Sequence, residues 1–332
     1  MEVTYLPKHV IRNLRPEDYG AVAKLLNTIL SEPTTAEMLK DEEDKIPPGK
    51  LHYSEEGMLL GWDRPKWVVE NEQDQIIAYA IAWRAPWAEP GELAFTLVVD
   101  PDRCSEGVGT ALYNTIHHWA EEVRASRLVT SIRESDSRAL TFAQQREYVQ
   151  ERHLFESVLD LSSFDGEPLY QSIEEAKQKG IQFTTLAEEP GEPNERKLHE
   201  LYEITSKDIP GYSGSYPWFE EWKKWSIEQN GVRPEWIHIA KDGDRYIGVA
   251  TLQQNEQTRA MYHEFTGVHP EYRGRHIALA LKMLAIRTAQ AYGVPYLRTH
   301  NDSLNGPMLR VNRDLLGFTG EPGLFKMVRE LS

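Results

Sequence analysis

The chain contains one internal repeat, which constrains the fold more than any other feature of the sequence. The segment VDPDRCSEGVGTAL (residues 99–112) aligns with VHPEYRGRHIALAL (residues 268–281), an offset of 169 residues (268 − 99). An upstream run, IIAYAIAW (residues 76–83), corresponds to YIGVATLQ (residues 246–253) at an offset of 170 (246 − 76). A chain that repeats itself at this distance is expected to fold as two copies of one domain.

Hydrophobic periodicity within the repeats predicts alternating strands and helices. In each half two strand-like runs flank a short polar turn, residues 71–74 or 241–244, which predicts a β-hairpin. Apolar residues then recur at steps of three and four from Val108 to Val123 and, less regularly, from Ile277 to Tyr292, which predicts one helix in each half. We therefore predict an α/β fold (α+β with a mixed sheet): two tandem domains, each a mixed, mostly antiparallel sheet flanked by helices.

The second half is predicted to end with a strand at residues 296–300, a short helix at about 305–315 and a last strand that opens at Gly317. The boundary between the halves is expected in the polar segment from Leu161 to Lys179, which has no strong core pattern. This gives a first domain of residues 1–165 and a second of residues 180–332. The loops and the family resemblance described below lead us to expect the first to be degenerate and the second to be catalytic.

Composition narrows the class of protein. Hydrophobic residues make up 40% and charged residues 27%, as in a soluble globular protein. The net charge of −15 argues against a nucleic-acid partner. It either serves solubility alone or favours a cationic or amine substrate through electrostatic steering. No apolar run is long enough for a membrane span, the first residues have no signal-peptide core, and Cys104 is the one cysteine. We therefore expect a cytoplasmic protein, monomeric or homodimeric, without a membrane partner.

A loop of the kind that binds anions precedes each repeated helix. The first N–H groups of a helix have no internal partner, a glycine lets the backbone approach a phosphate, and arginines add charge-assisted bonds. The second-half loop RGRHIA (residues 273–278) supplies all three, whereas the first-half loop CSEGVG (residues 104–109) has glycines but also Glu106. The glycines of the first-half loop are alternatively explained by the turn alone. Neither loop has the third glycine of a dinucleotide fold or the Lys-Ser/Thr pair of a P-loop. Acidic neighbours predict an inert Cys104.

Residues 266–318 resemble the acetyl-CoA-binding core of the GNAT superfamily of N-acyltransferases. Arg273 and Ala278 match the family pattern Gln/Arg-x-x-Gly-x-Gly/Ala, in which His276 replaces the middle glycine. The first half keeps both glycines, Gly107 and Gly109, and has Cys104 in the arginine position. The resemblance covers both halves, so the whole chain is similar to a tandem GNAT protein.

The resemblance implies acetyl-CoA as the acyl donor, with no metal. Its diphosphate would lie on loop amides, its pantetheine arm would pair with a fourth strand at about Met261–Val268, and a fifth strand would splay away from the fourth to leave a slot for the thioester. The residues assigned to acetyl-CoA are Thr266, Gly267, Val268, Arg273, Gly274, Arg275, His276, Ile277, Ala278, Asn305 and Asn312 in the second half, and Gly107, Val108 and Gly109 in the first. Asn305 is alternatively a helix N-cap.

Candidates for the catalytic base lie on the fourth strand. Because strand side chains alternate, Tyr262, Glu264 and Thr266 are predicted to share one face, with His263 on the other. Glu264 is the first choice for the base that takes a proton from the acceptor amine, and a solvated carboxylate is the alternative. His300 is a second candidate, and the resemblance marks its neighbour Asn301 as a functional polar position.

The general acid is less evident. Many family members carry a tyrosine near the position of Asn312, and the segment NRDLLGF is one residue longer than usual. Asparagine cannot act as an acid. Either water assists the departing thiolate, or Tyr262 does, or the domain does not catalyse. No acid is evident in the first half, around QQREYV (residues 144–149).

The sequence leaves the acceptor open. Trp218, Trp222 and Trp225 have helical spacing and either belong to the core or line an acceptor wall. His276 either donates to phosphate, points to solvent or weakens binding. The leading hypothesis is an N-acetyltransferase that acts on a small-molecule amine in a ternary complex. The alternatives are acetylation of a protein lysine or N-terminus, and a non-catalytic acyl-CoA-binding or scaffold protein.

Overall fold

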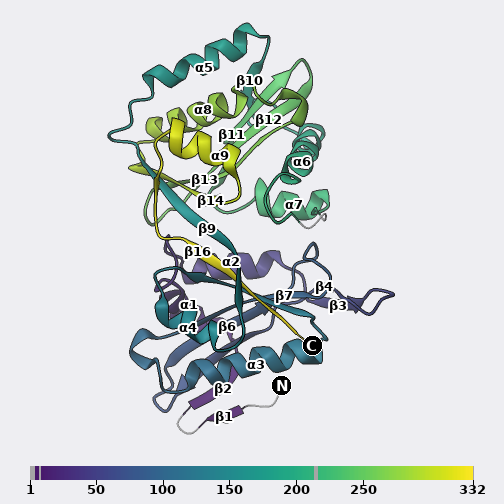
Figure 1. The fold of residues 1–332 in the computed structure, drawn as a ribbon, viewed down its shortest axis with the longest axis vertical. Coiled ribbons are helices and arrows are strands. Elements are labelled where there is room, and N and C mark those ends of the chain that lie inside the picture. Colours follow the sequence, from purple (N-terminus) through teal and green to yellow (C-terminus); the bar gives the residue numbers. More distant parts are fainter. Residues whose placement is uncertain (1–3, 7–8, 213–215, 332) are drawn as a thin grey trace. The chain divides into compact units, whose positions relative to one another are not determined.

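The chain forms two compact units. A computed structural model describes residues 4–6, 9–212 and 216–331. Unit 1 comprises Met1–Arg152 together with Leu324–Ser332, and unit 2 comprises His153–Gly323 (Figure 1). The mixed sheets confirm the predicted fold class, but the units divide differently from the predicted domains, which met between residues 165 and 180.

The difference arises because the last strands of the two repeats exchange partners. Strand β9 (Val149–Asp160) closes the first repeat, yet its residues 154–160 pair with β14 (Tyr296–Asp302) of unit 2. Strand β16 (Leu324–Glu330) closes the second repeat, yet it pairs along its whole length with β8 (Arg127–Arg133) of unit 1. Strand pairing is a long-range choice, so the hydrophobic pattern of each strand did not reveal it.

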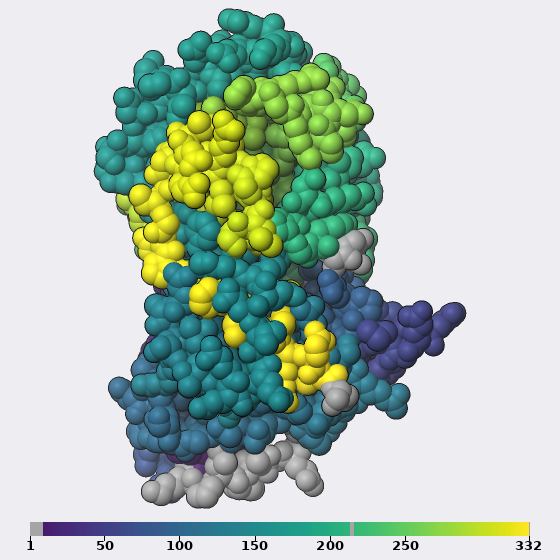
Figure 2. Space-filling view, viewed as in Figure 1, coloured from purple at the N-terminus to yellow at the C-terminus, as the bar shows by residue number. Residues whose placement is uncertain are grey.

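The sheet of unit 1 is mostly antiparallel. Only β7 and β8 run parallel among its neighbouring strands in the described residues. The strand order is β1 (Thr4–Leu6), β2 (His9–Asn13), β5 (Lys66–Asn71), β6 (Ile76–Trp83), β7 (Glu92–Val99), β8 and β16. A separate hairpin, β3 (Lys50–Tyr53) and β4 (Leu59–Trp62), projects from the surface of this unit (Figure 2). The helices are α1 (Tyr19–Leu26), α2 (Ala36–Lys45), α3 (Val108–Glu122) and α4 (Ser137–Gln144).

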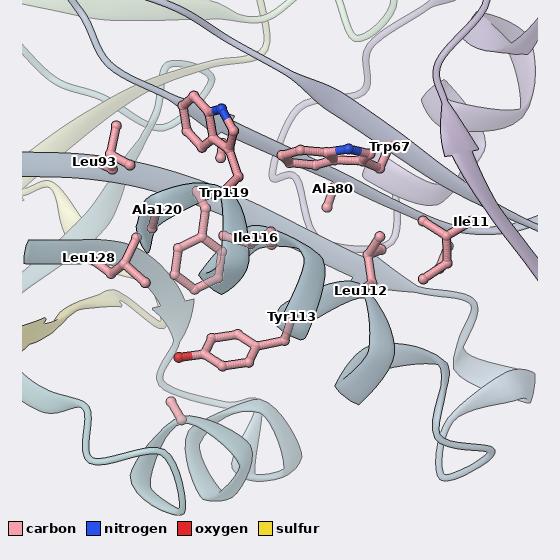
Figure 3. Close-up of a cluster of buried hydrophobic side chains, with 14 of the residues drawn as sticks. Ile11, Trp67, Ala80, Leu93, Leu112, Tyr113, Ile116, Trp119, Ala120 and Leu128 are labelled. Atoms are coloured by element: carbon pink, nitrogen blue, oxygen red, sulfur yellow. The ribbon is translucent and has the colours of Figure 1, made fainter. Parts of the chain in front are cut away.

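Helix α3 carries the core of unit 1, as its periodicity predicted. Its side chains Leu112, Ile116 and Trp119 are buried against the sheet (Figure 3). The Trp119 ring meets the Trp67 ring edge to face, with centroids 6.3 Å apart. One apolar face of α3 therefore fixes the helix, and with it the loop before Val108, to the sheet.

Unit 2 has a related sheet with β13 and β14 as its parallel pair. The strand order is β9, β14, β13 (Met261–Val268), β12 (Arg245–Gln254), β11 (Val232–Asp242) and β10 (Gln182–Thr185), and β15 (Thr319–Gly320) pairs with β9. The helices are α5 (Glu167–Gln178), α6 (Glu192–Ser206), α7 (Phe219–Ser226), α8 (Ile277–Ala291) and α9 (Gly306–Leu309), and a π-helical turn, η4 (Arg310–Leu315), follows α9.

Helices cover both faces of this sheet (Figure 1). Helix α8 packs on β11, β12 and β13 on one face, and α6 packs on β12 and β13 on the other. Helix α5 lies on α8, with Ile173 and Ala176 buried. This helix occupies the segment predicted to be a polar boundary; its pattern was weak because one narrow face meets the core. Within the described residues, no helix is long and apolar enough to cross a membrane.

Candidate active site

The loops before α3 and α8 have the same backbone conformation. Gly274 and His276 have φ values of 72° and 61°, and Ser105 and Gly107, at the corresponding positions of unit 1, have values of 72° and 84°. This left-handed region favours glycine. Each loop therefore has a glycine at one of its two left-handed positions and accepts a strained side chain at the other, which explains how His276 stands where the family pattern has glycine.

The loop before α8 presents backbone amides without partners. No group among the described residues accepts a hydrogen bond from the amides of Gly274, Arg275 or His276, and no side chain caps the helix. The positive end of a 15-residue helix adds to these donors. Ile277, the first residue of α8, is 1% exposed, and Ala278 follows in the first turn. These groups fit a diphosphate such as that of acetyl-CoA.

The arginines of this loop have partners of their own. The Arg273 guanidinium forms an ion pair with Asp208 and donates from Nε to the carbonyl of Val268 at 3.1 Å. Arg275 lies over the Tyr272 ring, 4.9 Å from its centroid. Arg273 therefore braces the loop against the end of β13 in this structure, and Arg275 is the arginine without a carboxylate partner among the described residues.

The loop before α3 is electrostatically different. Glu106 lies 3.7 Å from His9 and 3.8 Å from Arg103, so a carboxylate occupies the place where unit 2 has Arg275. Val108 is buried, and Gly109 lies in the first turn of α3. Cys104 hydrogen-bonds from its thiol to the Asp100 carbonyl. The geometry for an anion is retained here, but the charge opposes one.

Strands β13 and β14 separate, as predicted. They share two registered pairs, Met261 with Leu297 and Tyr262 with Arg298, and then diverge. The Thr299 hydroxyl donates to the His263 carbonyl at 3.1 Å where the separation begins. In unit 1, β7 and β8 separate after three pairs. Beyond these pairs the two strands of each unit are not in register within the described residues, and in unit 2 the Tyr262 hydroxyl takes the His300 amide at the split.

A β-bulge at Glu264 changes the predicted alternation along β13. Thr251 pairs with Phe265 and Leu252 with His263, so Glu264 has no partner residue in β12. Phe265 stacks on Tyr202 of α6, with centroids 4.2 Å apart. The two residues of a bulge oppose one partner and share a face, and Glu264 also lies near enough to Tyr202 to act on its charge, so Glu264 is on the α6 face too. Tyr262 and Glu264 therefore share a face as predicted, but the prediction for Thr266 was wrong, because the extra residue turns it to the α8 face.

Other residues of β13 serve packing. A Cβ on Gly267 would lie 2.4 Å from Thr205 Oγ1, so glycine is required where α6 crosses the strand. Val268 packs on the α8 side. His263 is 2% exposed on that same face, as expected for a packing residue.

Glu264 combines solvent access with a desolvated setting. Its side chain is exposed, yet the protein atoms around it raise the pKa of its carboxyl above the usual range. The exposed part of the carboxyl can exchange protons with solvent. The protein atoms packed around the rest of it remove part of its hydration and so raise its pKa. Such a carboxyl accepts a proton more readily than a fully solvated one.

Tyr262 belongs to a hydrogen-bonded chain on this face. Its hydroxyl bonds to His300 Nδ1 and accepts the His300 backbone N–H at 3.1 Å. His300 Nε2 lies 3.2 Å from Glu156 Oε1, and Arg298 donates to Glu156 Oε2 at 2.8 Å. Burial raises the pKa of Tyr262 well above its usual value. No pattern in the sequence pointed to Glu156, because this residue reaches the site only through the exchange of β9.

The three predicted asparagines have structural partners. Asn305 caps α9 by accepting the Met308 amide at 3.3 Å. Asn312 donates to Asn301 Oδ1 at 2.7 Å, and Asn301 donates to Ser157 Oγ at 2.8 Å; both asparagines are buried. The extra residue noticed in NRDLLGF is taken up by η4. Asn301 and His300 are consecutive in β14 and therefore point to opposite faces.

Of the three tryptophans with helical spacing, only Trp222 belongs to the core. Trp222 is 2% exposed and packs on Tyr202 and Phe219. Trp225 donates to Glu221 at 2.9 Å, and Trp218 is the exposed member of the three, at 53%.

Comparison with known proteins supports the assignment of both units. The sequence profile of the acetyltransferase (GNAT) family matches residues 32–148 and 198–318, more than half of the chain. No match is found among curated proteins.

Two solved structures are similar over nearly the whole length. One is a GCN5-related N-acetyltransferase from Sphaerobacter thermophilus, with 20% identity, a TM-score of 0.71, and coverage of 98% of this chain and 97% of that chain. The other is a tandem GNAT protein from the clavulanic acid biosynthesis pathway, with 16% identity, a TM-score of 0.74, and coverage of 97% and 98%. At these identities the likeness establishes the fold, and the two profile matches establish the family. The chain therefore belongs to the acetyltransferase (GNAT) family, with two GNAT domains in tandem.

Proposed function

We propose that unit 2 transfers an acetyl group from acetyl-CoA to the primary amine of a small molecule, by direct attack of the amine on the thioester in a ternary complex. The observation that carries this proposal is the coincidence of two features on β13. Strand β14 separates from β13 after Tyr262, near the N-terminal end of β13. The unpartnered amides of Gly274, Arg275 and His276 follow the C-terminal end of β13. The diverging edges of β13 and β14 suit the amide-containing pantetheine arm, and the loop amides suit the diphosphate.

Glu264 is the proposed base. An ammonium ion must lose a proton before its nitrogen can attack, and a carboxylate with a raised pKa on the open side of β13 is suited to accept it. The net charge of −15 favours approach of a cationic amine. We infer that unit 1 does not bind the diphosphate, because Glu106 would face it.

The binding half of the proposal is tested by calorimetry with coenzyme A on the full chain and on Gly274→Val. A β-branched residue is strained at a φ of 72° and distorts the amides, so affinity should fall at least tenfold. Gly293→Val is the matched control, because Gly293 has a φ of 69° and equally open surroundings but lies after α8. Equal affinity in both variants would remove the loop from the binding site.

The catalytic half is tested by thiol release from acetyl-CoA with a panel of small amines and a lysine peptide. Turnover with a small amine that Glu264→Gln reduces by about 10²-fold supports the proposal. Asn312 favours a second candidate, a non-catalytic acyl-CoA-binding protein, because this buried amide cannot supply the acid that many family members place nearby. Binding of coenzyme A without thiol release would support that candidate, and turnover with the peptide alone would indicate protein acetylation.

A further inference from the structure

We propose that Tyr262, His300 and Glu156 form a proton relay for acetyl transfer, in which Tyr262 contacts the reacting atoms and Glu156 is a positioning residue. The inference rests on the proposed function of unit 2. It assigns a role to a buried carboxylate that the base Glu264 does not need, and it supplies the proton donor that Asn312 cannot be.

The hydrogen bonds assign the tautomer of His300. Glu156 is paired with Arg298 as a carboxylate and can only accept, so His300 Nε2, 3.2 Å from Glu156 Oε1, carries the ring proton. In a neutral ring Nδ1 then carries no proton and accepts a hydrogen bond. The Tyr262 hydroxyl, which accepts the His300 backbone N–H at 3.1 Å, therefore donates its own proton to Nδ1.

Glu156 is held firmly enough to orient the ring. It lies directly opposite His300 in the register of β9 and β14 and is 5% exposed. Arg298 donates to its second oxygen at 2.8 Å and balances its charge. A carboxylate fixed in this way keeps the histidine in one tautomer and stabilises an imidazolium when one forms, as the buried carboxylate of a catalytic triad does.

The position of Tyr262 fits the chemistry. It is the last residue of β13 that pairs with β14, so its side chain stands at the point where the two strands separate. Glu264, two residues further on and on the same face, is the other titratable group near His300. The relay therefore lies beside the proposed base, and the groups facing it are Glu264, Glu156 and Arg298.

Acetyl transfer to an ammonium ion requires two proton removals, and the site has two groups to perform them. Glu264 takes the first proton, which frees the nitrogen lone pair. As nitrogen bonds to the thioester carbon, the nitrogen becomes positive and gives its second proton to the Tyr262 oxygen, whose own proton moves to His300 Nδ1. When the C–S bond breaks, the proton returns from His300 through Tyr262 to the thiolate. The products are the amide and the free thiol, and Glu264 releases its proton to water.

The relay is tested with Glu156→Gln, compared with Glu221→Gln in the same assay. Glu221 is a matched control because it is 7% exposed in unit 2 and bonds to Lys224 and Trp225 in α7. We expect Glu156→Gln to lower kcat by about 10²-fold without changing KM for acetyl-CoA, and Glu156→Asp to restore part of it. We expect Tyr262→Phe to be impaired at least as strongly, and Glu221→Gln to keep its kcat.

A second measurement covers the case in which Glu156→Gln does not fold. The ¹⁵N shifts of the His300 ring in the full wild-type chain should show a protonated Nε2 and an unprotonated Nδ1. The opposite tautomer, or an unchanged kcat in folded Glu156→Gln, would overturn the relay while leaving the acetyltransferase intact. Absence of thiol release by the wild-type chain with every amine would instead overturn the proposed function, and the relay with it.

Discussion

Lys282 offers a quantitative test of how α8 is held against the sheet. This lysine lies in the middle of α8, is 1% exposed, and has no ion-pair partner among the described residues. Burial lowers its pKa to about 7 from a usual value of 10.5. Two histidines on the same side of the sheet share this setting, because His263 and His238 are also buried with lowered pKa values. Replacing Lys282 with Met keeps the unbranched shape and removes the cost of burying an amine.

The size of the effect follows from the proton linkage. Unfolded Lys282 is protonated below pH 10.5 and folded Lys282 only below about 7, so the unfolded state binds more protons between these values and stability rises with pH. The penalty is fully developed below pH 7. A tenfold difference in proton affinity between the folded and unfolded states corresponds to about 1.36 kcal/mol. Lys282→Met should therefore stabilise unit 2 by about 4 kcal/mol at pH 7, about 2 at pH 9 and less than about 0.5 at pH 10.5.

Urea unfolding at these three pH values measures the gain, and hydrogen exchange of residues 277–291 assigns the transition to unit 2. Lys207→Met is the control, because Lys207 is exposed at the end of α6 and should change stability little. The diagnostic feature is the decline of the gain with pH. A gain that is the same at pH 7 and pH 10.5 would arise from hydrophobicity alone, and a loss of stability would mean that the ammonium has a partner; either result refutes the reasoning.

Two further predictions concern β13. Gly267→Ala should destabilise unit 2 by about 1–3 kcal/mol, because the new Cβ would lie 2.4 Å from Thr205 Oγ1. Gly306→Ala is the control and should not destabilise it, because the space around Gly306 is open. The urea unfolding midpoints of the two variants measure the difference. The pH profile of kcat/KM should show an acid limb above the normal range of a glutamate, since the carboxyl of Glu264 must be ionised to act and desolvation by the neighbouring protein atoms raises its pKa. An acid limb near pH 4, or one that Glu264→Gln leaves in place, would assign it to another group.

The parts of the fold that were predictable depend on local order. Repetition at 169 residues placed the starts of both helices, and α3 and α8 begin at Val108 and Ile277. The anion loop was predicted from the same alignment. Its glycine, however, stands at the second left-handed position in unit 1 (Gly107) and at the first in unit 2 (Gly274). Periodicity and turn residues act over a few positions, so one sequence is enough to identify them.

The parts that were not predictable depend on pairing. The bulge at Glu264 is an extra residue relative to β12, and no property of Glu264 itself marks it, so Thr266 was assigned to the wrong face. The extra residue before Phe318 was visible, but its accommodation in a π-helical turn depends on the burial of Asn312 beside Asn301. In each case the outcome was decided by a partner distant in the sequence.

The exchange of terminal strands gives the first repeat a role that does not require it to bind a ligand. Strand β9 belongs to the first repeat by sequence, yet it supplies Glu156 opposite His300 and continues the sheet of unit 2. A chain cut in the predicted boundary of residues 165–180 would separate unit 2 from β9 and leave Arg298 without its carboxylate. The same cut would deprive unit 1 of β16, the partner of β8. Neither repeat is thus a complete unit, and the proposed relay in unit 2 requires the first repeat even if acetyl-CoA binds only to the second.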